Sequence, residues 1–421
     1  MPATRGIGRK IGVTPTDTNL AVPAAAPGER ADGRDLFRWV IHPIDAEEFQ
    51  SRYYERAVCV IRRGNASYYD RLLSVEHLDR VLTTGLAKHP EISLVQNEKT
   101  IRSSEYVDDD GRVDPVRATR LFRQGATIIF THLHQRLPEL GRLCEGLERA
   151  FSSRMQTNIY LTPPSAQGFA PHWDTHDVFI LQIAGTKHWT IYDTKIPLPL
   201  RGQHFDRTVH AIGEPTMEFT LESGDACYVP RGAIHSARSS DDTSLHITTG
   251  LIAHTWVDLL LQAVVAAGID DVALRQNLPV GWPEMAADGR LAGEYRARIE
   301  TLVAHIASAP PPFGVLAETL TADYNSLSTG LLKRAIDSNR LTLASLVRMR
   351  DDAVAQPCEN ERCSIRCGPK ELEMPLAALP ALEYMRQHRP CVVGALPDDL
   401  DDESKLVLVR RLVAEGIVDA S

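Results

Sequence analysis

The fold is decided by residues 157–193, which read TNIYLTPPSAQGFAPHWDTHDVFILQIAGTKHWTIYD. Short runs rich in β-branched and aromatic residues, such as TNIYLTP, DVFILQIA and KHWTIYD, alternate here with segments rich in Gly, Pro, Asp and Ser. This alternation is typical of short β-strands separated by turns. It continues through MEFTLES, DACYVP, AIHSARS and SLHITTGLIA to about residue 254. Many short strands in series predict a β-sandwich or a β-barrel.

Two segments between these strands are rich in turn-forming residues. AGTK, residues 184–187, lies between two predicted strands, and ESGD, residues 222–225, precedes another. Glycine in such a short connection favours a tight reversal, so each segment is expected to close a β-hairpin.

Helical periodicity flanks the strand-rich segment on both sides. Before it, LSVEHLDRVLTTG predicts a helix with Ser74 as its N-cap and Gly85 beyond its end. After it, TWVDLLLQAVVAAG, GEYRARIETLVAHIAS and TGLLKRAIDSN predict three helices. The first of these carries an apolar face formed by Trp256, Leu260, Ala263, Val264 and Ala267. Such a face needs a covering surface, which is either the rest of the chain or a second copy of it.

The last part of the chain reads as a separate unit. LASLVRMRDDAV, LPALEYMRQH and ESKLVLVRRLVAEG predict three helices, the last of which starts after the acidic run Asp401, Asp402, Glu403 and ends at Gly416. Short helices with brief β segments between them are consistent with a winged-helix fold.

Composition limits the classes of function. The chain has 421 residues, 43% of them hydrophobic, which is enough for two or three domains. Its net charge of −9 argues against a general nucleic-acid binder and is compatible with a basic protein or peptide partner. No apolar run approaches the roughly 20 residues needed to cross a membrane. Residues 1–33 show no periodicity and are expected to form a disordered tail.

Seven cysteines are scattered along the chain, an odd number that suggests reduced thiols and a cytoplasmic location. Cys358, Cys363 and Cys367 form a cluster, but their spacing is not that of a zinc knuckle and no histidine lies among them. A cysteine-containing loop is therefore favoured over a zinc site.

The chemistry is carried by the HxD sequence at His172 and Asp174. In an extended segment, residues two apart project from the same face. His235, in VPRGAIHSA, opens another predicted strand. Two imidazoles and one carboxylate occupy one face of an iron octahedron and leave three positions open. Because HxD alone is weak, a solvated turn with two ordinary histidines remains the alternative.

Lys187 favours the iron hypothesis. It lies 15 residues after His172 on a segment that can point back into the barrel. A buried cation is costly unless it is paired, and a dicarboxylate co-substrate would supply the partner. Arg231 is expected to cap a turn, and Trp189 and Phe179 are expected to be core residues. The remaining nearby histidines are expected to be structural or solvent-facing; they are His176, His188, His204, His210 and His246.

These segments, with GDACYVPRGAIHSA and SLHITTG, resemble the JmjC/cupin-4 ribosomal oxygenases from about Phe37 to Trp256. The resemblance implies an α+β fold. A double-stranded β-helix (cupin/JmjC) barrel would occupy residues 34–255, a helical dimerisation region 256–335, and a C-terminal winged-helix domain 336–421. It also implies a homodimer and an Fe(II)- and 2-oxoglutarate-dependent dioxygenase. The reaction would hydroxylate a side chain of a protein or peptide, such as a ribosomal protein His or Arg.

The resemblance assigns roles by matching position. The implied metal ligands are His172, Asp174 and His235; the implied 2-oxoglutarate residues are Lys187, Asn158 and Thr248; the implied substrate-side residues are Tyr160 and Trp173. The sequence departs from the family pattern at Trp173, where Tyr is usual, at Thr175, where an acid is common, and at Gly250, where Ser is expected. No ligand is lost, so the departures concern the substrate.

Other functions fit the same residues. The same chemistry can act on a small molecule or on a biosynthetic precursor peptide, which a C-terminal winged helix could hold. Lysine demethylation is a lesser variant, because nothing in the sequence is specific for methyl-lysine. A non-catalytic cupin that binds a ligand or partner is the third hypothesis, and the intact HxD…H set with Lys187 argues against it.

Overall fold

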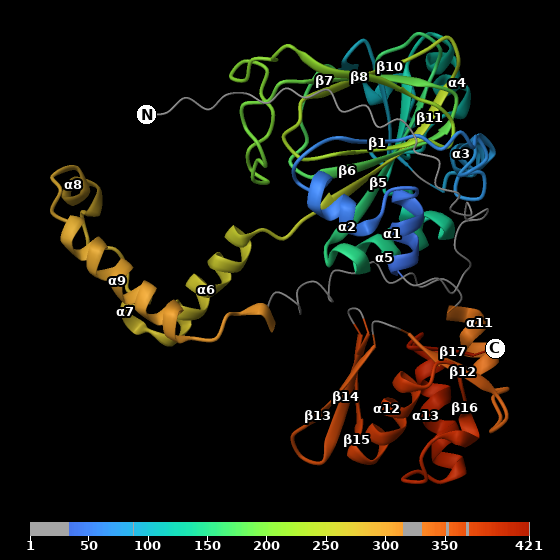
Figure 1. Cartoon of the computed structure of the whole chain (residues 1–421), viewed down its shortest axis with the longest axis vertical. Helices are drawn as coiled ribbons and strands as arrows, with labels where there is room; N and C mark the ends of the chain where they lie inside the picture. The colour runs from blue at the N-terminus through green and yellow to red at the C-terminus, as the bar shows by residue number, and fades with distance from the viewer. Residues whose placement is uncertain (1–32, 87, 315–330, 351–352, 368–369, 421) are drawn as a thin grey trace.

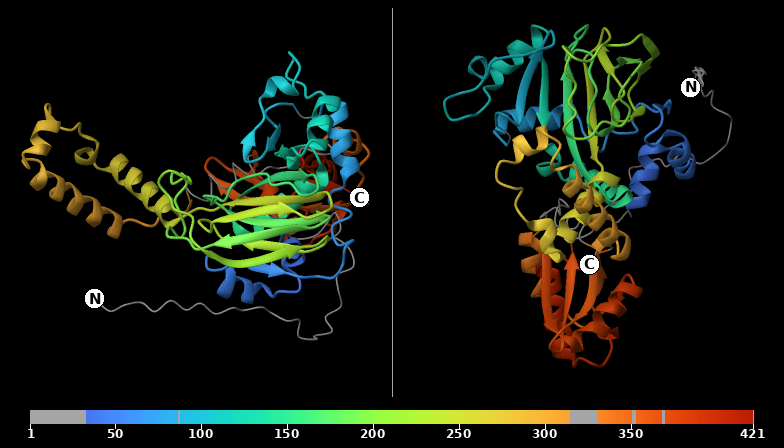
Figure 2. Two further views of the ribbon diagram at one scale, coloured as in Figure 1. Left: turned by 90° about the horizontal axis from the view of Figure 1, so that it is seen from above. Right: turned by 90° about the vertical axis from the view of Figure 1, so that its left-hand side faces the viewer.

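The computed structural model describes residues 33–86, 88–314, 331–350, 353–367 and 370–420. A β-rich unit carries a helical arm on one side and a C-terminal unit below it (Figures 1 and 2). The tail expected over residues 1–33 lies outside the described residues except for its last position. Within the described part of the chain, no helix has the length and apolar character needed to span a membrane.

Two antiparallel sheets form the β-rich unit. The larger has eight strands in the order β1-β9-β6-β11-β5-β4-β2-β3. Their bounds are β1 Cys59–Ile61, β2 Ile92–Gln96, β3 Lys99–Thr100, β4 Thr127–Thr131, β5 Arg154–Thr162, β6 Asp177–Ala184, β9 Ala226–Val229 and β11 Ser244–Ile252. The smaller has the order β10-β7-β8, with β7 at Lys187–Tyr192, β8 at Pro215–Leu221 and β10 at His235–Ser239. The strands expected from residue 157 to about 254 are all present.

The two expected hairpins are not hairpins. β6 belongs to the large sheet and β7 to the small one, so the chain changes sheet at AGTK; it changes sheet again at ESGD, between β8 and β9. Glycine is required at both crossings because the chain packs closely against distant backbone. A Cβ at Gly185 would lie 2.0 Å from the Thr243 carbonyl oxygen, and one at Gly224 would lie 1.9 Å from that of Asn65. The two strands joined by each of these segments, β6 with β7 and β8 with β9, therefore lie in opposite sheets.

Helices from the first half of the chain cover the outer face of the large sheet (Figure 1). They are α1 Gly33–Ile41, α2 Ala46–Glu48, the π-helix η1 Phe49–Tyr53, α3 Val75–Thr84, α4 Pro115–Arg123 and α5 Pro138–Phe151. Phe49 packs on Phe179 and Tyr228, with ring centroids 5.7 and 5.0 Å apart. The expected ends of α3 are confirmed: Ser74 forms a capping box, and Gly85 follows in the left-handed conformation with φ 67°.

A second apolar cluster lies between the two sheets. Val178 and Ile180 of β6 pack there with Trp189 and Ile191 of β7, whereas Phe179 belongs to the cluster under the helices. Successive residues of a strand point to opposite faces, so even-numbered residues of β6 line the interior of the barrel. This alternation determines which side chains reach the site.

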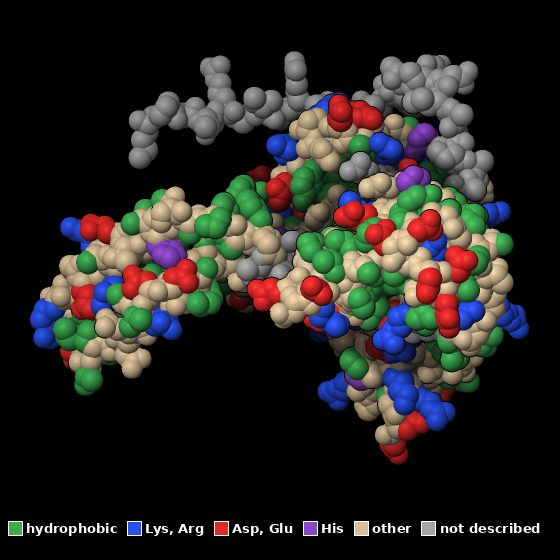
Figure 3. Space-filling view, turned by 90° about the horizontal axis from the view of Figure 1, so that it is seen from below, with side chains coloured by type: hydrophobic (Ala, Val, Ile, Leu, Met, Phe, Trp, Pro, Cys, Tyr) green, Lys and Arg blue, Asp and Glu red, His purple; other side chains and the backbone are tan. Residues whose placement is uncertain are grey.

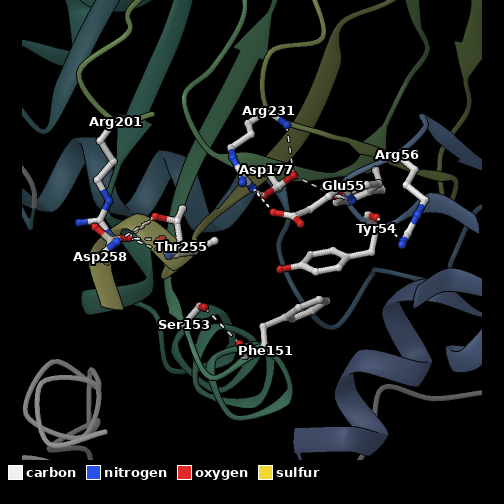
Figure 4. Close-up of polar contacts among 12 residues, drawn as sticks. Tyr54, Glu55, Arg56, Phe151, Ser153, Asp177, Arg201, Arg231, Thr255 and Asp258 are labelled. Atoms are coloured by element: carbon white, nitrogen blue, oxygen red, sulfur yellow. Dashed lines mark hydrogen bonds and ion pairs between the residues drawn. The ribbon is translucent and has the colours of Figure 1, made fainter. Parts of the chain in front are cut away.

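The arm consists of α6 Trp256–Asp270, α7 Val272–Arg275, α8 Trp282–Ala287 and α9 Ala292–Ser308. It projects away from both other units (Figures 1 and 2). Thr255 and Asp258 form a capping box that fixes the start of α6 (Figure 4). Only Leu259, Ala263 and Ala267 of α6 are buried, and α9 has no buried residue.

In the C-terminal unit, α11, Leu331–Ser338, packs against α13 and β17. This helix spans the domain boundary predicted between residues 335 and 336. The helix expected over residues 343–354 is wrong, since β12, Leu346–Met349, pairs with β16 and β17 instead. The other elements are β13 Val354–Cys358, β14 Arg362–Cys367, β15 Lys370–Pro375, α12 Leu379–Gln387, β16 Cys391–Val392, α13 Asp402–Ala414 and β17 Val418–Ala420.

The three clustered cysteines lie on the β13–β14 hairpin, not in a loop, and no disulfide joins them. They are not brought together as a metal site in the part of the chain that the structure describes.

Candidate metal centre

The fold brings the HxD segment against the start of β10. The backbones of His172 and His235 pair, with the His235 amide donating to the His172 carbonyl at 2.8 Å and the reverse bond at 3.2 Å. One ligand atom from each of His172, Asp174 and His235 lies within 4.8 Å of the others. No other metal-binding group of this kind occurs among the described residues.

Backbone carbonyls orient both imidazoles. Nδ1 of His172 lies 2.8 Å from the Ala170 carbonyl oxygen, and Nδ1 of His235 lies 2.9 Å from that of Ala233. A ring N–H that donates there leaves the Nε2 lone pair free. The two Nε2 atoms lie 4.0 and 3.7 Å from the carboxylate oxygens of Asp174. The three donors thus converge on one point.

The electrostatics favour the forms that bind a metal. Burial opposes the charge on Asp174, but the imidazoles of His235, His176 and His172 hold the pKa of its carboxyl below the usual value. Burial, and then the neighbouring His172, lowers the pKa of His235. A charged carboxylate at Asp174 and a neutral imidazole at His235 are the forms that bind a divalent metal without first losing protons. Two imidazoles and one carboxylate fit Fe(II) with open positions.

Four further residues expected at the site line the same cavity as this group: Asn158, Tyr160, Lys187 and Thr248. Asn158 of β5 and Thr248 of β11 lie directly opposite each other in the large sheet. Tyr160 lies opposite His246, and their rings stack with centroids 4.8 Å apart. One interior wall therefore carries all three of the predicted strand residues.

Lys187 is a buried cation inside this cavity. It is 4% exposed, and burial lowers its pKa to about 7. Its Nζ donates to the Thr162 hydroxyl at 3.2 Å, and it forms no ion pair with a described carboxylate. Trp189, two residues along β7, presents a buried Nε1–H with no acceptor in the same described set. Two buried donors without an anion fit a carboxylate group of a small molecule.

Trp173, which the resemblance places on the substrate side, lies outside the cavity. Its side chain is 4% exposed and does not line the cavity. Its Nε1–H donates to the Gln203 carbonyl at 3.0 Å, and its ring packs on Phe205 and His210 with centroids 4.9 and 4.4 Å away. The residue between two ligands in an extended segment points to the opposite side. Trp173 therefore packs against the loop between β7 and β8 and lies outside the cavity.

Several cavity residues were not expected there. His176 and His246, expected to be structural or solvent-facing, both line the cavity, as do Phe169 and Trp189. The sequence predicts the place of Trp189, because Trp189 lies two residues from Lys187 on one strand and so faces the same side. No sequence pattern predicts that the Thr162 hydroxyl accepts from Lys187. That contact depends on how β5 and β7 are placed in space.

Arg231 does more than cap a turn. Its guanidinium lies 3.0 Å from the Asp177 carboxylate and 2.5 Å from that of Glu55, and its backbone N–H also donates to Asp177 at 3.1 Å (Figure 4). The Tyr228 hydroxyl donates to Asp177 as well, at 2.8 Å. Asp177 is fully buried and Arg231 is 8% exposed. Because Asp177 follows the HxD segment and Arg231 precedes His235, this ion pair joins the two ligand-bearing segments.

Arg231→Ala is expected to lower the free energy of unfolding by about 3–5 kcal/mol, because it leaves the Asp177 carboxylate buried without its cation. Urea unfolding followed by circular dichroism measures the loss. Arg290→Ala, which breaks an exposed pair with Asp288, is the matched control and should cost less than about 1 kcal/mol. Equal losses in the two variants would contradict a structural role for the buried pair.

Comparison with known proteins gives one family model. The model of the JmjC domain matches residues 131–259, a span that includes the HxD segment, Lys187 and His235.

Curated relatives match far more of the chain. Ribosomal oxygenase 1 of Bos taurus is 33% identical over 458 residues, covering 96% of this chain and 68% of the relative. Ribosomal oxygenase 1 of Danio rerio is 27% identical, covering 98% and 84%. The bifunctional lysine-specific demethylase and histidyl-hydroxylase NO66 of Aedes aegypti is 33% identical over 284 residues, and this chain spans only 44% of its length.

Among solved structures, the ribosomal oxygenase YcfD from Escherichia coli in complex with cobalt and succinic acid is similar, with a TM-score of 0.50 and 15% identity. The match covers 90% of this chain and 99% of that one. At this identity the likeness concerns the fold alone, and it agrees with the mixed helix-and-sheet JmjC/cupin architecture described above.

Proposed function

Because this chain belongs to the ribosomal oxygenases, a family of JmjC-domain proteins, we propose that it uses Fe(II) and 2-oxoglutarate to hydroxylate a side chain of a ribosomal protein. One observation carries the proposal: the convergent His172, Asp174 and His235 share a cavity with the buried and anion-free Lys187. A binding protein without catalysis would have no use for an open metal face beside a buried cation.

Each residue has a proposed task. His172, Asp174 and His235 hold the iron, and Lys187 pairs with the distal carboxylate of 2-oxoglutarate. Asn158 and Thr248 orient the co-substrate from the facing wall, and Tyr160 lies beside them. When bound, iron and 2-oxoglutarate would activate dioxygen, so that one oxygen atom converts the C–H bond to C–OH and the other enters succinate, with release of carbon dioxide. The protein holds one C–H bond in position and excludes the others.

Lys187 makes 2-oxoglutarate affinity depend on pH. Burial lowers its pKa to about 7, so the free enzyme loses the ammonium charge above that pH. A bound carboxylate favours the charged form and raises the pKa in the complex. Binding above pH 7 therefore takes up a proton, and we expect the Kd of 2-oxoglutarate to rise by up to about tenfold per pH unit toward pH ~9.

Calorimetry with Mn(II) in place of Fe(II), in two buffers of different ionisation enthalpy, measures both the affinity and the proton uptake. A Kd that stays constant from pH 7 to about 9, with no proton taken up, would contradict this assignment.

We further propose that the arm is a dimerisation region. Its exposed apolar side chains include Trp256, Leu260, Leu261, Val264, Val265, Ile269, Tyr295 and Val303, and hydrophobic side chains are visible along it in Figure 3. A monomer seldom exposes so large an apolar surface on a projecting element. A second copy of the chain is the partner that this family suggests.

Light scattering at micromolar concentration is expected to give twice the 46.6 kDa of one chain. The variant Leu260→Glu/Val264→Glu places two charges on one face of α6 and should give a monomer. Val407→Glu, at an exposed position of α13, is the matched control and should remain dimeric. A monomeric wild type would refute the proposal.

For the C-terminal unit we propose a winged-helix fold. Its support is the combination of three helices, α11, α12 and α13, with the small sheets β16-β12-β17 and β13-β14-β15. Its buried cluster contains residues of both the helices and the strands, so it has a core of its own.

The proposed function is tested by mass spectrometry. The enzyme is incubated with iron, 2-oxoglutarate and the proteins of both ribosomal subunits from its own source, and the products are searched for the addition of one oxygen atom. Omission of 2-oxoglutarate is the control. Oxidation of free small molecules or of peptides encoded by neighbouring genes, with ribosomal proteins left unchanged, would overturn the ribosomal substrate and leave the iron chemistry intact.

A further inference from the structure

Gly250 lies on the interior wall of the barrel. It pairs with Val178, whereas Thr248 pairs with Ile180, so Gly250 lies nearer to the HxD segment that precedes β6. On β11 it follows Thr248 by two residues and so faces the same side. Its neighbours across the sheet are Gln156 of β5 and Val178 of β6. A side chain at position 250 would therefore project into the space beside the start of β6.

The imidazole of His176 fills that space. A Cβ added to Gly250 would lie 2.5 Å from Cδ2 and 2.7 Å from Nε2 of His176. Both distances are well below an ordinary contact of about 3.5–4.0 Å. The backbone of Gly250 is not in the left-handed region, so conformation does not require glycine here. Glycine is required because the His176 ring occupies the place of its side chain.

His176 presents this ring to the cavity without a partner. It lines the cavity with the metal group but does not belong to the set of converging ligand atoms. The ring nitrogens of His172 and His235 are held by backbone carbonyls. His176, in contrast, makes no hydrogen bond to any described residue. An imidazole offers one N–H donor and one acceptor nitrogen, and in His176 neither is bonded to a described residue.

We propose that His176, seated by Gly250, is a specificity-determining residue that contacts the target side chain. The inference rests on the proposed function and adds one residue to it, which would recognise a flat target side chain that carries N–H groups. Such a group stacks on the His176 ring or donates to its acceptor nitrogen while a neighbouring carbon faces the metal. An aliphatic target side chain would leave both nitrogens unpaired.

A double-mutant cycle tests the pair. His176→Ala and Gly250→Ala are each expected to lower kcat/KM for the ribosomal target about tenfold, the scale of one hydrogen bond, through KM for the target rather than KM for 2-oxoglutarate. The first variant removes the ring and the second displaces it. In the His176→Ala background, Gly250→Ala meets no ring and is expected to have little further effect.

A second readout does not depend on turnover. The probe is a fluorescent peptide that contains the ribosomal residue on which the enzyme acts, and Mn(II) replaces Fe(II). Its affinity should weaken by the same factor in both single variants. Wild-type affinity and oxidation by His176→Ala would overturn the inference, as would an equal effect of Gly250→Ala in both backgrounds. A wild type that oxidises ribosomal proteins only at aliphatic residues would overturn the inference alone. A wild-type enzyme that oxidises no ribosomal protein would contradict the proposed function as well.

Discussion

Alanine at His172, at Asp174 or at His235 is expected to abolish the release of succinate from 2-oxoglutarate. Each residue supplies one of three converging donor atoms, and each variant leaves only two. Loss of a group that merely supports a ligand costs about 10–100-fold in affinity or activity, so loss of a ligand should exceed about 100-fold. Succinate release at saturating iron and 2-oxoglutarate measures the effect, and visible absorption of bound Co(II) measures metal affinity.

His188→Ala is the matched control for these variants. His188 lies on β7 with its ring exposed, and its Nδ1 lies 3.2 Å from the Thr220 hydroxyl. Its loss should leave turnover unchanged. The ligand variants are expected to unfold near the wild-type temperature, since none of the three side chains belongs to an apolar cluster. Turnover near wild type in any one of them would place the metal elsewhere.

The elements of the β-rich unit follow from local sequence, but the pairing of its strands does not. Alternation of polar and apolar residues predicts β5 to β11, and the residues at both ends of α3 predict its limits. The same local signals make AGTK and ESGD look like hairpin turns. Gly185 and Gly224 instead serve contacts with Thr243 and Asn65, and such long-range contacts cannot be read from a short segment.

A similar limit explains the error at LASLVRMRDDAV. Its apolar residues fit a helix about as well as a strand, and short apolar runs do not separate the two. Pairing of Val347 with Cys391 and Ala420 decides for a strand, and both partners lie far along the chain. Tertiary contacts override local propensity here.

In the site, the alternation of side chains along a strand predicts the positions of some residues but not of others. It places His172 and Asp174 on one face, and the same rule puts Trp173 on the other, where the structure has it packed on Phe205. Prediction of His176 needed more than alternation. Its place depends on the adjacency of β6 and β11 and on the missing side chain of Gly250, which only the assembled sheet brings together.

Replacing Lys187 with methionine is expected to raise KM for 2-oxoglutarate by about two orders of magnitude or more. Removing one partner of a buried charge pair costs about 3–5 kcal/mol, and about 1.4 kcal/mol corresponds to a factor of ten. Lys187 is 4% exposed and forms no ion pair with a described carboxylate, so we expect the co-substrate to supply the anion. Initial rates of succinate release at varied 2-oxoglutarate measure KM.

Stability separates this role from a structural one. Burial lowers the pKa of Lys187 to about 7, which shows that the free protein disfavours the charge at this position. At neutral pH the lysine of the unfolded chain keeps its usual pKa and holds its proton more tightly than the buried lysine does. The buried lysine therefore destabilises the fold at neutral pH. Methionine fills similar space without a charge and should not lower the unfolding temperature. Lys195→Met, at an exposed position, is the control and should keep the wild-type KM. An unchanged KM in Lys187→Met would mean that another basic residue pairs with the distal carboxylate of 2-oxoglutarate. A lower unfolding temperature together with weaker Co(II) binding would mean that Lys187 has a structural role.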